Sequence, residues 1–90
     1  MTVYYLHKSY DTDKFYEICR AVEEIYKDYE KKQLLVDIDD SLIQTYTNGD
    51  KKIIIDNCAQ SGLIKARANV DLSDFSYTHA MFKDGKYIKK

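Results

Sequence analysis

Two aspartates stand at the end of an apolar run near the middle of the chain. Asp37 and Asp39 follow the run that begins at Leu34, and Ser41 comes two residues later. Closely spaced carboxylates can act as a nucleophile or as a general acid and base, and they can hold a divalent cation. This stretch is therefore the first place in the sequence to look for catalysis.

The stretch LLVDIDDSLIQT, residues 34–45, resembles the first motif of the haloacid-dehalogenase-like phosphotransferases, which is an apolar strand followed by Asp-x-Asp-x-Thr. The resemblance implies that Asp37 attacks phosphorus, that Asp39 is the general acid and base, and that Mg²⁺ neutralises the phosphate. Ser41 stands where that family has threonine. A β-hairpin directly after the motif would match the flap of that family.

The rest of the chain lacks the parts that this chemistry needs. Phosphoryl transfer also requires a group that holds the phosphate and further carboxylates for the metal, which that family places on later strands of a parallel sheet. The 45 residues after Thr45 contain no crossover long enough to join parallel strands. We therefore predict that the chain is not an enzyme and has no catalytic residue, metal site or cofactor.

The simpler interpretation of the aspartates is structural. A strand with Leu34, Val36 and Ile38 facing inward places Asp37 on its solvent side, and residues 39–41 then form a turn into the next strand.

The cysteines and histidines give no specific signal for a site. Cys19 and Cys58 are too few for a secreted disulfide framework, and with His7 and His79 they show no zinc-binding spacing. Cys19 falls on the apolar face of a helix, so we expect it in the core. Cys58 ends a strand, and the sequence leaves open whether it approaches either histidine.

One helix and several strands must position these residues. Apolar residues recur every three or four positions between Thr12 and Lys32, which predicts a helix over that range with a cap among residues 11–13. The remaining segments favour strands, namely Thr2–His7, Leu34–Ile38, Leu42–Thr47, Lys51–Cys58 and Leu63–Leu72. We expect an α+β domain spanning residues 1–90, with one long N-terminal helix on one face of a mainly antiparallel sheet in the order β-α-β-β-β-β(-β).

Alternation along the strands assigns side chains to the two faces of that sheet. Between Leu63 and Leu72 the apolar residues Ile64, Ala66, Ala68, Val70 and Leu72 alternate with polar ones. The small side chains of the two alanines predict that the helix crosses the sheet there. The last segment is ambiguous, because residues 73–83 fit a capped helix as well as a strand; we favour a strand, then a turn at Asp84-Gly85 and a short return.

The dipeptide Asn48-Gly49 predicts a type I′ hairpin with a two-residue loop. In that register Thr47 opposes Asp50, Thr45 opposes Lys52, and Ile43 opposes Ile54. A single helix cannot cover both faces, so we expect an uncovered apolar patch with a basic rim, which is typical of a binding surface. The predicted partner-binding residues are Ile43, Thr45, Lys52, Ile54, Leu63, Lys65 and Arg67.

Composition narrows the class of protein. The net charge of −1 argues against non-specific nucleic-acid binding, although the charge is uneven: residues 75–90 carry four lysines and one aspartate. Nine tyrosines are more than so small a core can hold, and tyrosine is favoured at recognition surfaces. No apolar stretch approaches membrane-spanning length and no export signal is visible, so we expect a cytoplasmic protein.

These observations favour a small non-catalytic protein-binding module, such as an inhibitor, an adaptor, or an immunity-type or phage-type modulator. Its partner would be another protein or a second copy of the chain. The first alternative is a nucleic-acid-binding module in which aromatic side chains stack on bases while lysine and arginine meet phosphates. The second is a magnesium-dependent phosphotransferase-like site at Asp37 and Asp39.

Overall fold

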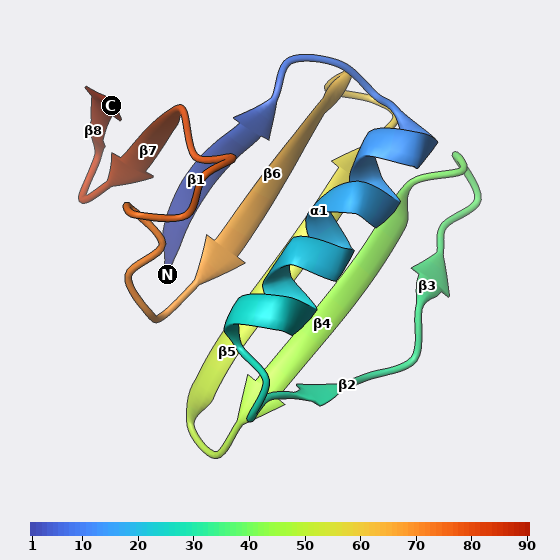
Figure 1. The fold of residues 1–90 in the computed structure, drawn as a ribbon. Coiled ribbons are helices and arrows are strands. Elements are labelled where there is room, and N and C mark those ends of the chain that lie inside the picture. The colour runs from blue at the N-terminus through green and yellow to red at the C-terminus, as the bar shows by residue number, and fades with distance from the viewer.

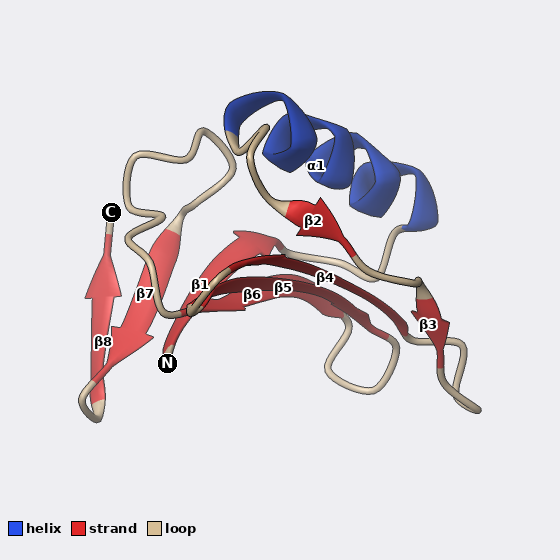
Figure 2. Ribbon diagram, turned by 90° about the horizontal axis from the view of Figure 1, so that it is seen from below, coloured by secondary structure: helices blue, strands red, loops and turns tan.

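The computed structural model describes residues 1–90 as one helix and an eight-stranded antiparallel sheet. The elements are β1 (Thr2–His7), α1 (Thr12–Ile25), β2 (Glu30–Lys31), β3 (Leu35–Val36), β4 (Leu42–Asn48), β5 (Lys51–Cys58), β6 (Leu63–Ala68), β7 (Ala80–Lys83) and β8 (Lys86–Lys89). The strand order is β2-β4-β5-β6-β1-β7-β8, and β3 also pairs with β4. The helix lies on one side of the sheet (Figures 1 and 2), which confirms the predicted α+β class.

The helix begins where the sequence predicts and ends earlier. Asp11 caps it by accepting a hydrogen bond from the Lys14 N–H at 3.0 Å. The chain leaves the helical conformation at Tyr26, whereas the apolar spacing predicted a helix as far as Lys32. Residues 30–31 pair instead with the edge of β4, so sheet hydrogen bonds replace helical ones there. Tyr29 still packs against the core, from a turn rather than from the helix.

The core lies between the helix and one face of the sheet. Phe15, Ile18, Cys19 and Val22 are buried on the helix. The sheet contributes Tyr4, Leu6, Leu42, Tyr46, Ile53, Ile55, Ile64, Ala66 and Ala68 to the same cluster. The helix approaches β5 most closely, so the prediction that it crosses the alanines of β6 is wrong.

Segment 69–79 fills the part of this face that the helix leaves open. β6 ends at Ala68, not at the predicted Leu72, because the Asn69 side chain turns the chain by bonding Lys52 N–H and the Asp50 carbonyl. Leu72 and Phe75 then enter the core from this segment. The predicted strand beginning at Phe75 is therefore wrong, and β7 starts only at Ala80. The turn at Asp84-Gly85 and the return strand β8 are confirmed.

The β4–β5 hairpin has the predicted two-residue loop, displaced by one residue. Asn48 pairs with Lys51, so the loop is Gly49-Asp50, and only Gly49 has a positive φ, 58°, as in type II′ turns. Thr45 consequently opposes Ile54 rather than Lys52, and Ile43 opposes Asp56 rather than Ile54. The pairing moves by two residues, so every side chain keeps its predicted face.

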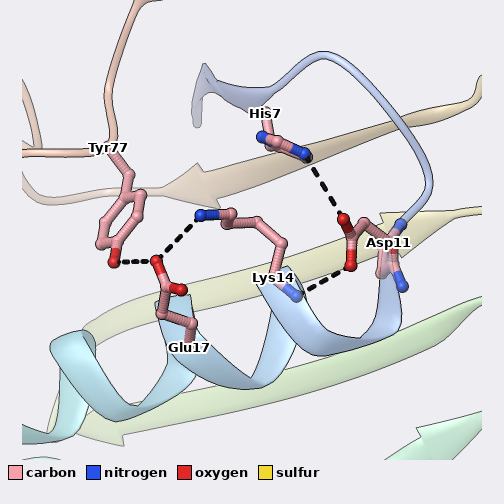
Figure 3. Close-up of polar contacts among 6 residues, drawn as sticks. His7, Asp11, Lys14, Glu17 and Tyr77 are labelled. Carbon is pink, nitrogen blue, oxygen red and sulfur yellow. Dashed lines mark hydrogen bonds and ion pairs between the residues drawn. The ribbon is translucent and has the colours of Figure 1, made fainter.

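Two tyrosine hydroxyls, one buried and one partly buried, connect the helix to the rest of the fold. The Tyr46 hydroxyl donates to Glu23 Oε2 at 2.6 Å, and Lys31 Nζ lies 3.2 Å from the same oxygen. At the other half of the helix, the Tyr77 hydroxyl donates to Glu17 (Figure 3). Hydrogen bonding from Tyr77 and Lys14 lowers the pKa of the Glu17 carboxyl. Each carboxylate thus joins the helix to a different part of the fold.

We expect the Tyr46→Phe variant to lose about 1–3 kcal/mol of unfolding free energy, because it removes a buried donor to a charged acceptor. Urea denaturation followed by circular dichroism measures the loss. Tyr16→Phe is the matched control, since Tyr16 is 41% exposed on the helix surface and should leave stability unchanged. Equal effects of the two substitutions would contradict the role assigned to Tyr46.

Candidate functional site

The candidate site is the face of the sheet that points away from the helix. Strand alternation and the observed register place all seven predicted partner-binding residues on this face, namely Ile43, Thr45, Lys52, Ile54, Leu63, Lys65 and Arg67. Ile54 lies between Thr45 and Arg67 on the neighbouring strands. We call this surface the open face. The sequence predicted this grouping, and the binding role of these residues stays a prediction.

The open face continues across β1, β7 and β8, three strands that carry none of the seven predicted residues. Val3 opposes both Arg67 and Phe82, and Tyr5 opposes both Lys65 and Ala80. Tyr87 in turn opposes Phe82. The alternation within each strand was visible in the sequence, but the pairing of β1 with β6 and β7 was not.

No other segment of the chain covers the open face. Figure 2 shows the helix and segment 69–79 on the opposite side of the sheet. Ile43, Ile54 and Leu63 are half-buried by their neighbours in the sheet alone. Larger exposures occur at the two ends, where Leu35 beside Ile43 is 57% exposed and Tyr87 is 63% exposed. The face is thus left uncovered by other segments, and its use as an apolar binding patch stays a prediction.

A buried carboxylate lies within the open face. Asp56 opposes Ile43 and Lys65, and its side chain lies 3.9 Å from the Arg67 guanidinium. Asp56 is only 8% exposed. Burial raises the pKa of this carboxyl, while Lys65 and Arg67 act in the opposite direction. The Arg67 Nε atom is buried and has no hydrogen-bond partner in the chain.

Asp37 and Asp39 lie in an exposed turn. Asp37 N–H donates to the Ser41 carbonyl, and Asp39 accepts from Ser41 N–H at 3.0 Å. The Ser41 hydroxyl accepts from Ala59 N–H, which ties the turn to the end of β5. β3, which precedes this turn, spans only Leu35–Val36. The predicted inward orientation of Val36 and Ile38 is wrong, since Val36 is 63% exposed and Ile38 fully exposed.

The surroundings of these aspartates differ from a phosphotransferase site. Every strand pair is antiparallel, so no parallel strand brings further groups to the end of β3. No group of three or more histidine, cysteine or acidic side chains is placed to hold a metal ion. The resemblance to the phosphotransferase motif therefore ends at residues 34–45.

The two cysteines lie in contrasting environments. Cys19 is buried on the side of the helix that faces the sheet, and burial raises the pKa of its thiol to about 11. Cys58 is half-buried on the open face, opposite Leu63. Hydrogen bonding from Ser61, whose N–H lies 3.4 Å from Sγ, lowers the pKa of the Cys58 thiol. Neither cysteine forms a disulfide.

Comparison with protein families, with curated proteins and with solved structures finds no match to this chain. The single helix is too short and too polar to cross a membrane.

Asp56→Asn should change the pH dependence of stability. Because the folded-state pKa of Asp56 is raised, its contribution to the unfolding free energy is fully present below the ordinary value of 3.8 and is lost as pH rises through the raised pKa. Asparagine does not titrate, so the variant should gain stability relative to wild type as pH rises from below 3.8 through the raised pKa. Urea denaturation of both proteins across this range tests the sign; a constant difference would contradict it.

Iodoacetamide should distinguish the two cysteines at about pH 7.5, because only the thiolate reacts and access is required. We expect one adduct in the folded protein, located at Cys58 by peptide mass spectrometry, and a second at Cys19 only after unfolding in urea. The Cys58→Ser variant should give no adduct while folded. Labelling of Cys19 at a similar rate in the folded protein would contradict this assignment.

Proposed function

We propose that this protein is a small non-catalytic binding module that docks another protein, or a second copy of itself, through the open face. The observation that carries the proposal is an apolar surface left uncovered by its own chain. Ile43 and Ile54, which are diagonal neighbours on β4 and β5, form its apolar centre; Leu63 lies beyond Asp56 and Lys65, and exposed apolar side chains continue the face at both ends. Uncovered apolar patches of this kind mark interaction surfaces.

The dimensions of the face suit a protein partner. The two longer principal extents of the chain are 29 Å and 29 Å, so in projection the open face spans at most on the order of 800 Å², similar to the area that a standard interface buries on each partner. Lys52, Lys65 and Arg67 surround the apolar centre. An apolar centre with a polar rim, enriched in arginine and tyrosine, is the usual composition of protein interfaces.

The buried acidic group weighs against the nucleic-acid alternative. A surface that tracks phosphates gains affinity from unpaired basic side chains. On the open face, Arg67 instead faces Asp56, and Asp56 also opposes Lys65. This pairing offsets part of the positive charge at the middle of the face, so protein docking is the function that the arrangement supports best.

Site-specific photocrosslinking tests the proposal even when the partner is unidentified. A benzophenone amino acid replaces Thr45, which lies on the open face, and in a separate protein replaces Tyr16 on the outer surface of the helix. In cells that naturally contain the protein, position 45 should give a discrete adduct, with itself or with another protein. Position 16 should not give this adduct.

A second substitution in the crosslinking protein identifies the surface that binds. Ile54→Glu places a charge in the apolar centre and should weaken docking at least tenfold, or about 1.4 kcal/mol, so the adduct should disappear. Ile25→Glu is the matched control, since Ile25 is 57% exposed at the end of the helix. The absence of any adduct at position 45, or equal loss with both substitutions, would refute the proposal.

A further inference from the structure

A basic hollow lies where the open face reaches β1, β7 and β8. It is a half-open hollow of about 630 Å³, lined by Tyr5, His7, Lys8, Leu63, His79 and Lys89. Four of these six side chains are lysine or histidine, and none is acidic. This local excess of basic groups contrasts with the net charge of −1 for the whole chain.

The fold, not a run of basic sequence, brings these side chains together. They come from the end of β1, the start of β6, the residue before β7 and the end of β8. A register shift in β1 between Tyr5 and His7 changes how the strand meets β6. Such bulges redirect side chains and are frequent beside functional sites. The lining therefore depends on the paired backbone of four segments.

Backbone hydrogen bonds fix His79 between two of those strands. Its N–H donates to the Tyr5 carbonyl at 2.9 Å, and its carbonyl accepts from Lys90 N–H at 2.8 Å. Lys89 lies close to His79, because it pairs with Ala80, the next residue after His79. The backbone of His79 is thus hydrogen-bonded on both sides, while Lys89 lies on the edge strand β8, which pairs with β7 alone.

His7 is oriented by the start of the helix. Its Nε2 atom lies 3.8 Å from Asp11 Oδ2, and the other ring nitrogen points away from this carboxylate (Figure 3). Asp11 uses its second oxygen to cap the helix at Lys14 N–H. The carboxylate nearest to His7 in this network is therefore engaged with the helix end, and it does not line the hollow.

The hollow also has an apolar, partly aromatic wall. Tyr5 lies against Tyr87, with ring centroids 5.8 Å apart. Leu63 lies on β6, which pairs with β1 on the side away from β7. Flat rings pack favourably on such a surface. The volume falls in the range of small-molecule sites, about 300–1,000 Å³, and exceeds what a lone phosphate ion needs.

We infer that this hollow binds a small organic phosphate that carries a flat ring, of the size of a nucleoside monophosphate. Lys8 and Lys89 contact the phosphate through charge-assisted hydrogen bonds, and the ring N–H groups of the two histidines also donate to its oxygens. Tyr5 and Leu63 pack against the ring. The site goes beyond protein docking, since Leu63 is the only one of the seven predicted partner-binding residues that lines it.

Titration of the ¹⁵N-labelled protein with adenosine 5′-monophosphate tests the inference by NMR. We expect saturable shifts confined to the amides around Tyr5, His7, Leu63 and His79. Adenosine and inorganic phosphate, titrated separately, should each bind at least tenfold more weakly, because adenosine lacks the phosphate and inorganic phosphate lacks the ring. Equal affinity for either one, or shifts spread over the helix, would overturn the inference.

Substitution of Lys8 and Lys89 tests where the phosphate group binds. The double variant Lys8→Ala/Lys89→Ala should weaken adenosine 5′-monophosphate at least tenfold, and because both side chains are exposed the fold should be retained. Lys86→Ala is the matched control: it lies on the same strand as Lys89, points to the other face and does not line the hollow. It should change affinity less than twofold. Equal weakening by the control, or none by the double variant, would overturn the inference.

Discussion

The structure depends on one constraint: a single helix of 14 residues must shield a sheet of eight strands. At 1.5 Å per residue the helix is about 21 Å long, shorter than the 29 Å extents of the chain. It covers the region around β5, and segment 69–79 fills the remainder of the same side by inserting Leu72 and Phe75. None of residues 1–90 packs over the other face, so its side chains are covered only by one another.

The fold buries polar groups on both sides of the sheet, and each side leaves one side-chain nitrogen without a partner: Asn57 Nδ2 on the helix side and Arg67 Nε on the open face. Beneath the helix, the hydroxyl of Tyr46 has partners at Glu23 and Cys19, so its burial is compensated. On the open face, Asp56 is paired only at 3.9 Å, and Arg67 Nε has no partner. Incompletely satisfied polar groups cost stability, and they can be satisfied by a partner that brings donors or acceptors to them.

The features that the sequence predicted are those that depend on capping and on short-range periodicity. The start of the helix at Asp11 follows from capping chemistry, and the faces of β4, β5 and β6 follow from alternation, which survives a register change of two residues. The helix end, the length of β3 and the path of residues 69–79 were not predictable. They are set by contacts between distant segments, such as β2 with β4, Ser41 with Ala59, and Tyr77 with Glu17. The basic hollow has the same origin, because its side chains are as far apart in sequence as Tyr5 and Lys89.

The sheet edges favour the face, rather than an edge, as the surface for the proposed association. β2 and β3 occupy the outer edge of β4, which removes one row of free backbone groups. β8 forms the other edge, and there Lys86 and Lys89 flank the exposed Tyr87 and Ile88. Charged side chains on an edge strand discourage the addition of another strand, because pairing would bury or crowd them. Association by extending the sheet is therefore disfavoured at both ends, which leaves side-chain packing on the open face as the route by which this chain can bury its remaining apolar surface.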